Sequence, residues 1–173
     1  MTRAITCTTR APRAGEKNGV DYHFLDSTEF QRYVRAGDFL EHATVFGRSY
    51  GTLQSEVLDR LRGGRDVLLN VDVQGAASIR RRAKAEPDLK RALVTVFLTP
   101  ASVAVLEERL NKRNTDAPKE IQKRLGLARQ EIAQWTKFDY LLISATISED
   151  LRRMLVIVEA EKLRAARATA PEF

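Results

Sequence analysis

Arg10 and Arg13 lie three residues apart in the segment TTRAPRAGEKNGVDY, residues 8–22. An arginine guanidinium is a planar fork of donors that matches phosphate oxygens, so two on one short loop can clamp a dianion. Pro12 restrains the backbone between them, and the glycines that follow permit turns that bring Tyr22 back toward the same anion. The segment predicts a phosphate clamp, although an exposed basic loop would contain the same residue types.

The segment FLEHATVFGRSYGT, residues 39–52, places Glu41 in an apolar setting, where a carboxylate without partners is costly to bury. A guanine ring offers N1–H and N2–H as adjacent donors that one carboxylate accepts together, and the Thr52 hydroxyl can donate to O6. Adenine presents the wrong pattern of donors and acceptors. Tyr50 adds a hydroxyl within reach of a phosphate. We expect a reader of guanine here, the alternative being a surface glutamate on an edge strand.

Three arginines occur in the segment LEERLNKRNTDAPKEIQKRL, residues 106–125. Arg109 and Arg113 are four residues apart and share one face of a predicted helix, while Arg124 follows a polar interruption that contains Pro118. Helix, interruption and helix together predict a lid. Such a lid could bring three positive charges over a phosphoryl group during its transfer. Ordinary ion pairs with neighbouring glutamates are the alternative.

The elements that must position these residues alternate between strand and helix. Three apolar runs predict strands buried on both faces of a parallel sheet, at 66–73, 92–100 and 138–145. A further strand is expected at 3–8, an extended segment at 39–46 and a turn at 47–52. Helices are expected from Asp26 to Gly37, from a Thr52 cap to Gly63, and over 74–86, 101–110, 121–135 and 148–168. This order predicts an open α/β sheet with helices on both faces.

Ligands of such sheets bind beyond the carboxyl ends of the strands, which is where Arg10, Asp72, Pro100 and Ser144 fall. The length of 173 residues predicts one domain, and no apolar run approaches the ~20 residues that span a bilayer. No leader pattern is found, and the lone Cys7 indicates a reducing cytosol. The net charge of +6 is compatible with nucleic acid, a membrane surface or a small anion.

Taken in order, five segments resemble guanylate kinase, the enzyme that phosphorylates GMP with ATP. They are TTRAPRAGEKNGVDY, FLEHATVFGRSYGT, LLNVDVQGA, RLNKRNTDAPKEIQKRL and FDYLLISA, and the likeness covers essentially all of the chain. The resemblance implies a P-loop kinase-like parallel sheet flanked by helices, in a single domain over 1–173. It also implies an inserted GMP-binding region at 10–52 and a lid at 111–124, with the remainder as core.

The resemblance further implies roles for individual residues. The GMP phosphate would be held by Arg10, Arg13, Tyr22 and Tyr50, with Thr6 near it. The guanine would be read by Glu41, Thr52 and Asp72, with Gly51 giving a close backbone approach. The catalytic lid residues that meet the ATP adenine and phosphates would be Arg109, Arg113 and Arg124. Ser144 stands where an asparagine often contacts the adenine, and Asn70 stands where many relatives carry a carboxylate.

One departure from the family pattern is larger. Guanylate kinases begin with a strand and a phosphate loop of the form G-x-x-G-x-G-K-[S/T], and neither Gly-Lys-Ser nor Gly-Lys-Thr occurs in these 173 residues. The first strand and the Walker A loop are therefore expected to be absent, which leaves unpaired backbone groups and an apolar slot in the sheet. We expect GMP binding to persist and turnover by this chain alone to be very low.

The implied co-substrate is ATP with Mg²⁺. A phosphate oxygen of GMP would attack the γ phosphorus of ATP in line, giving GDP and ADP without a side-chain nucleophile. We expect a cytoplasmic monomer or homodimer that binds neither nucleic acid nor membrane and has no metal ligands of its own. A second hypothesis is a catalytically silent module whose clamp grips GMP or a phosphorylated peptide. Retention of the lid arginines argues against that module. Nucleic-acid binding by the basic surface is a third and weaker interpretation.

Overall fold

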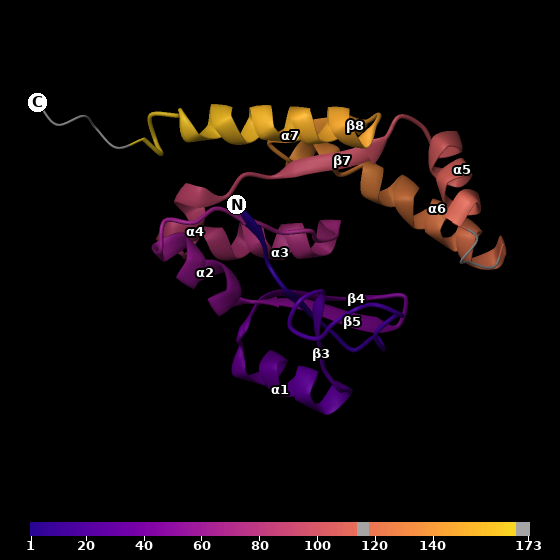
Figure 1. Cartoon of the computed structure of the whole chain (residues 1–173), viewed down its shortest axis with the longest axis horizontal. Coiled ribbons are helices and arrows are strands. Elements are labelled where there is room, and N and C mark those ends of the chain that lie inside the picture. Colours follow the sequence, from indigo (N-terminus) through magenta and orange to yellow (C-terminus); the bar gives the residue numbers. More distant parts are fainter. Residues whose placement is uncertain (114–117, 169–173) are drawn as a thin grey trace, which may run out of the picture. The chain divides into compact units, whose positions relative to one another are not determined.

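The computed structural model describes residues 1–113 and 118–168, without the side chains of 113 and 118–120. The chain divides into two compact units, Met1–Leu93 and Val94–Phe173. The single domain predicted from chain length stays a prediction. Figure 1 shows the order of helices and strands along both units.

A four-stranded sheet organises the first unit, in the order β3, β2, β5, β4. Its strands are β2 (Thr6–Thr8), β3 (Tyr22–Phe24), β4 (Phe39–Val45) and β5 (Arg48–Leu53). Strand β2 pairs parallel with β3 and antiparallel with β5, and β4 and β5 form an antiparallel hairpin. The predicted turn at 47–52 is therefore wrong, because that segment is strand β5 and the chain reverses at Phe46 and Gly47.

Helix α1 (Ser27–Ala36) covers one face of this sheet. Its cap is the one predicted, because the Asp26 side chain accepts a hydrogen bond from the Glu29 backbone N–H at 2.8 Å. Gly37 ends the helix with φ of 73°, a left-handed conformation that glycine adopts without strain. Phe30 of this helix packs with Cys7 and Phe39 of the sheet in a buried cluster.

The rest of the first unit has a second core. Helices α2 (Gln54–Arg62), α3 (Val73–Ala83) and α4 (Pro87–Ala92) enclose it with two short strands, β1 (Thr2–Arg3) and β6 (Val67–Leu68), which pair in parallel. Its buried members are Ala4, Leu40, Val57, Leu58, Ile79, Ala83 and Leu89. The strand predicted at 66–73 is limited to two residues, because Thr2–Arg3 is all that pairs with it in the described chain.

The predicted cap at Thr52 is also wrong. Leu53 occupies the N-cap position of α2 and makes no side-chain hydrogen bond there. The Thr52 hydroxyl donates instead to Glu41 on the neighbouring strand, which takes it away from the helix.

Two parallel strands form the sheet of the second unit, β7 (Val96–Pro100) and β8 (Tyr140–Ser144). Around them the chain forms α5 (Val103–Arg113), α6 (Pro118–Ile132), the 3₁₀ turn Trp135–Lys137 and α7 (Ile147–Lys162). Leu110 of α5 packs against Ile121 and Leu125 of α6. These elements agree with the strand and helix order predicted for this half of the sequence.

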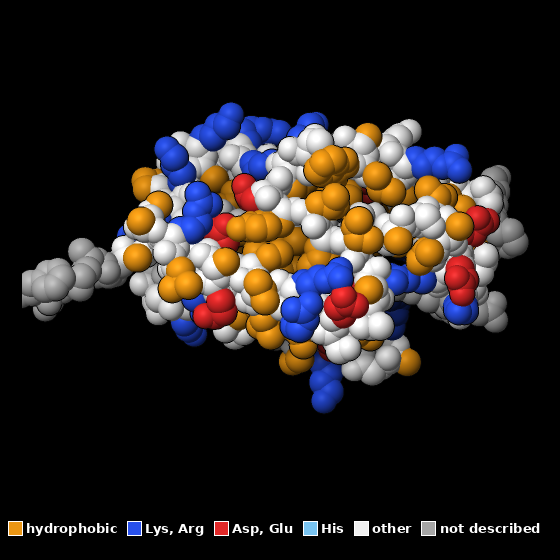
Figure 2. Space-filling model, turned by 90° about the horizontal axis from the view of Figure 1, so that it is seen from above, with side chains coloured by type: hydrophobic (Ala, Val, Ile, Leu, Met, Phe, Trp, Pro, Cys, Tyr) orange, Lys and Arg blue, Asp and Glu red, His pale blue; other side chains and the backbone are white. Residues whose placement is uncertain are grey.

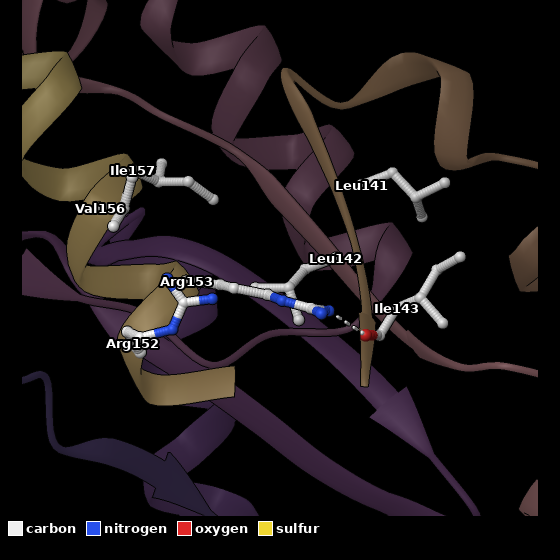
Figure 3. A pocket seen from close by; sticks show the side chains of 7 residues that line it. All are labelled: Leu141, Leu142, Ile143, Arg152, Arg153, Val156 and Ile157. Carbon is white, nitrogen blue, oxygen red and sulfur yellow. Dashed lines mark hydrogen bonds between the residues drawn. The ribbon is translucent and has the colours of Figure 1, made fainter. Parts of the chain in front are cut away.

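The expectation that these strands are buried on both faces is wrong for the second unit. Phe97 and Leu142 are buried, whereas Leu98, Leu141 and Ile143 are exposed, so apolar side chains alternate between buried and exposed along these two strands. Figure 3 shows the hollow between β8 and α7, where Arg153 Nη1 donates to the Ile143 carbonyl at 3.1 Å.

Helix α7 also presents apolar side chains to solvent. Ile147, Leu151 and Leu155 follow one another at intervals of four residues and are exposed. Figure 2 shows hydrophobic side chains among Lys and Arg side chains on the face seen from above. Among the helices described, none has the length and apolar character that crossing a bilayer requires.

Candidate functional site

The predicted phosphate clamp is built around Arg10. Its guanidinium Nη2 donates to both carboxylate oxygens of Glu16, at 2.8 and 3.0 Å, and the Arg13 backbone N–H donates to the same carboxylate at 2.6 Å. Hydrogen bonding to Glu16 raises the pKa of Arg10 above its usual value, with smaller contributions from Tyr50. The loop therefore holds Arg10 as a fixed cation, while the Arg13 side chain is exposed.

Aromatic rings fix the same guanidinium from another side. The Arg10 guanidinium carbon lies 5.3 Å from the centre of the Tyr22 ring and 5.9 Å from that of Phe24, within range of cation–π attraction. Tyr22 and Tyr50 meet edge to face with their ring centres 6.4 Å apart. The structure therefore places Arg10, Tyr22 and Tyr50 side by side.

Strand register explains why this cluster shares a sheet face with the predicted base reader. Thr6 pairs with Tyr22, Thr8 pairs with Tyr50, and Glu41 pairs with Thr52. Paired residues lie on the same face of a sheet, and so do residues two apart along a strand. Tyr22, Tyr50, Thr52 and Glu41 consequently project from one face, opposite the face that α1 covers.

A β-bulge makes this arrangement possible at Glu41. Phe39 pairs with Leu53 and Glu41 pairs with Thr52, so β4 contains one extra residue, Leu40, between the two pairs. Phe39 enters the cluster beneath α1, and Leu40 enters the core formed with α2 and α3. Glu41 is left to point to the opposite sheet face.

Glu41 is a buried carboxylate with one hydroxyl partner. Its exposed fraction is 5%, and its Oε1 accepts a hydrogen bond from Thr52 Oγ1 at 2.8 Å. Burial raises the pKa of Glu41, the charge of Asp72 adds to the rise, and the Thr52 hydrogen bond partly opposes it. Thr52 is itself fully buried, so in this structure it acts on Glu41, and its predicted donation to guanine O6 stays a prediction.

Asp72 approaches Glu41 from the start of α3. It is the N-cap of that helix, and its Oδ1 accepts a hydrogen bond from the Gly75 backbone N–H at 2.7 Å. The two predicted base-reading carboxylates, Glu41 and Asp72, are therefore neighbours. Gly51 lies differently, because a Cβ there would fall 2.9 Å from the Phe39 ring, on the side of α1. Packing accounts for that glycine, and its approach to a nucleotide stays a prediction.

In the second unit, two of the residues predicted to meet ATP lie together. Arg109 Nη1 donates to the Ser144 hydroxyl at 3.0 Å, and Nη2 donates to the Ala145 carbonyl at 3.3 Å. The Ser144 hydroxyl in turn donates to Asp150 at 2.7 Å. Hydrogen bonds from the Ala145 backbone and from Ser144 lower the pKa of Asp150, which keeps this carboxylate charged.

The remaining lid residues are only partly covered by the structure. Arg124 lies half-buried on α6. Arg113 ends α5, and its side chain lies outside the described residues, as do residues 114–117 of the predicted lid at 111–124. The convergence of the three lid arginines therefore stays a prediction.

Sequence reasoning missed three residues that hold this machinery. Glu16 anchors Arg10, and an acidic residue three after Arg13 in a glycine-containing turn was the available signal. Thr8 is fully buried, donates to the Ser49 carbonyl at 3.1 Å and accepts from the Arg10 backbone at 3.2 Å. Asp150 anchors Ser144, and its place in the first turn of a helix could have indicated it.

The chemistry available at this site is recognition of a base and an anion. Among the side chains that the structure describes, no three or more His, Cys, Asp or Glu residues form a group that could hold a metal ion. A divalent metal therefore does not fit a cage made by the described residues. The first unit offers Glu41 and Asp72 as acceptors for the N–H donors of a base, and Arg10 as a donor to an anion.

Comparisons with known proteins point to one family. The family model described as guanylate kinase matches residues 1–161. A guanylate kinase of Coxiella burnetii is 43% identical over 161 residues, which are 93% of this chain and 75% of the relative. One from Alcanivorax borkumensis is 44% identical over 167 residues, 96% of this chain and 77% of the relative.

A solved structure supports the same assignment. The crystal structure of guanylate kinase from Anaplasma phagocytophilum superposes with a TM-score of 0.78 at 33% identity, covering 95% of this chain and 78% of that one. Its α/β fold agrees with the fold class predicted from the strand and helix order. The chain belongs to the guanylate kinase family.

Proposed function

We propose that this chain binds GMP through its first unit and serves ATP-dependent phosphorylation of GMP. The observation that carries the proposal is the shared sheet face, on which the buried Glu41 carboxylate and the Tyr22 ring project from paired strands, with the guanidinium of the loop residue Arg10 over that ring. A guanine presents two adjacent N–H donors to Glu41, and its 5′-phosphate is a dianion suited to Arg10. This chain covers about three quarters of the length of relatives named guanylate kinase, which supports the activity.

On the acceptor side, each residue has a defined task. Glu41 accepts from N1–H and N2–H of guanine, with Asp72 beside it and Thr52 holding the carboxylate in place. Arg10, Arg13, Tyr22 and Tyr50 hold the phosphate, and Thr6 lies beside Tyr22 on the neighbouring strand. When GMP binds, its phosphate replaces the Glu16 carboxylate as the partner of Arg10, so the guanidinium stays paired.

On the donor side, Arg109 and Ser144 bind ATP, and Arg109, Arg113 and Arg124 neutralise charge on the transferring phosphoryl group. The fixed position of Arg109 over Ser144 and Ala145 supports this part of the proposal. A Mg²⁺ ion would arrive on the phosphates of ATP, since the described residues do not form a cage for it. The 173 residues contain no G-x-x-G-x-G-K-[S/T] motif, so we expect little turnover from them alone.

Isothermal titration calorimetry with GMP, AMP and a phosphoserine peptide tests the proposal without requiring turnover. We expect GMP to bind with a dissociation constant of about 1 μM to 1 mM, the usual range for a substrate, and AMP to bind at least about tenfold more weakly. Equal binding of AMP would contradict the role of Glu41. Binding of the phosphopeptide in preference to GMP would support the non-catalytic module instead.

A further inference from the structure

Gly75 lies where the two candidate base-reading carboxylates meet. It is buried near the start of α3, and its backbone N–H donates to Asp72 Oδ1. A Cβ atom at this position would lie 2.8 Å from Glu41 Oε2, 3.1 Å from the Val71 Cβ and 3.3 Å from Asp72 Oδ1. The Glu41 carboxylate therefore occupies the space that a side chain at residue 75 would need.

The backbone does not require a glycine at this point. Gly75 belongs to a regular helix and is not among the residues with positive φ, whereas Gly37 and Gly64 are. Alanine forms helices more readily than glycine, so helix stability alone would favour alanine at residue 75. Of the three atoms that a Cβ here would meet, Glu41 Oε2 is the nearest, so the position of its carboxylate is the first feature that an added methyl group would disturb.

We propose that Gly75 is a specificity-determining positioning residue, which seats the Glu41 carboxylate for recognition of the guanine edge. The inference rests on the proposed binding of GMP. Glu41 Oε2 is the far end of a flexible side chain, so a methyl group at residue 75 would displace the carboxylate before it displaced the helix. Thr52 would lose its alignment with Oε1 in the same movement.

The expected consequence is a selective loss of guanine recognition. Inosine monophosphate lacks the 2-amino group, so it offers Glu41 one N–H donor where GMP offers two. Displacement of the carboxylate removes the two-donor contact that GMP makes. IMP makes only one of these hydrogen bonds, so its affinity falls less. We expect Gly75→Ala to weaken GMP binding about tenfold, the loss of one charge-assisted hydrogen bond, and IMP binding by less than about threefold.

Calorimetry on the whole chain tests this with a matched control. Gly126→Ala makes the same change in helix α6, where a Cβ meets nothing within 4 Å. We expect this variant to bind GMP and IMP as the wild type does. An equal loss of GMP and IMP affinity in Gly75→Ala, or no loss at all, would overturn the inference, because either result means that the carboxylate had not been moved selectively.

A ligand-free measurement separates this inference from the proposed function. The Glu41 side-chain carboxyl resonance, followed by carbon-13 NMR, should shift in Gly75→Ala and stay unchanged in Gly126→Ala. A shifted resonance supports the positioning contact even if the wild type fails to bind GMP, a failure that would overturn the proposed function. An unmoved resonance overturns the positioning role even if GMP binds.

The case in which Gly75→Ala unfolds is covered by a second variant. Glu41→Ala removes the nearest group that the new methyl would meet, so Gly75→Ala combined with Glu41→Ala should fold and melt at or above the temperature of Glu41→Ala alone. If the double variant is also unfolded, the constraint at residue 75 comes from Val71 or Asp72 and the inference is wrong.

Discussion

Replacing Thr52 with valine removes one hydroxyl from the buried face of β5 and keeps the shape of the side chain. That hydroxyl donates to Glu41 Oε1 at 2.8 Å, and Glu41 is 5% exposed, so water cannot readily take its place. A hydrogen bond to a charged group contributes roughly 1.5–3 kcal/mol, against roughly 0.5–1.5 kcal/mol for a neutral one. We therefore expect Thr52→Val to lower the free energy of unfolding by about 1.5–3 kcal/mol when Glu41 is ionised.

The loss should depend on pH, with a sign that follows from the raised pKa of Glu41. Because burial raises that pKa, the folded protein binds the proton more tightly than the unfolded chain does. This contribution to stability is complete below the unfolded pKa and is lost as pH rises through the folded pKa. Removing the Thr52 donor raises the folded pKa further, so the penalty of Thr52→Val grows with pH above the ordinary range of a glutamate.

Urea unfolding followed by circular dichroism between pH 4 and pH 8 measures both quantities. The penalty should fall to about 0.5–1.5 kcal/mol at the acid end, where the carboxyl is protonated and its hydrogen bond is neutral. Thr44→Val, at an exposed threonine of the same sheet, is the control and should change stability by less than about 0.5 kcal/mol. A Thr52→Val penalty that is the same at every pH would refute the pH-dependent hydrogen bond between Thr52 and the Glu41 carboxyl.

Three further predictions concern the clamp, a helix end and the thiol. Arg10→Lys should weaken GMP binding about tenfold to a hundredfold in calorimetry, because an ammonium cannot make the paired contacts of a guanidinium stacked on Tyr22; an unchanged affinity would remove Arg10 from the site. Gly37→Ala should cost about 1–2 kcal/mol and lower the melting temperature by several degrees, because its φ of 73° disfavours a side chain. Burial raises the pKa of Cys7 to about 12, so iodoacetamide at pH 8 should label it only after unfolding, as judged by mass spectrometry; rapid labelling of the native protein would contradict this.

Local signals were sufficient to predict much of the fold. Asp26, Glu29 and Gly37 mark the ends of α1 because capping is decided within a few residues. The apolar runs at β7 and β8 likewise identified strands. The hairpin of β4 and β5 was missed because Gly51 and the polar residues around it are typical of a turn, whereas pairing with β2 and β4 makes them a strand. Burial on both strand faces was wrong for a related reason, since it depends on neighbours that a local pattern does not contain.

The candidate site was predicted in its residue types more fully than in its contacts. Paired arginines, a tyrosine and an isolated acid can be recognised in a sequence because their side chains are suited to binding an anion and the N–H donors of a ring. The anchoring partners are less readable. Glu16 and Asp150 look like ordinary surface acids, and Thr8 like an ordinary strand residue, until the loop conformation brings each to its partner. The task of Thr52 depended on the register of two strands.

The extra residue in β4 has a mechanical consequence. A regular strand sends its side chains in two directions, but Phe39, Leu40 and Glu41 reach three different surroundings in consecutive positions. Leu40 thereby anchors the hairpin that carries Glu41 in the core that it shares with α2 and α3. Asp72 is the N-cap of α3. The hairpin cannot swing away from that helix without pulling a leucine out of the protein interior, so the distance between the two acids is set by an apolar anchor.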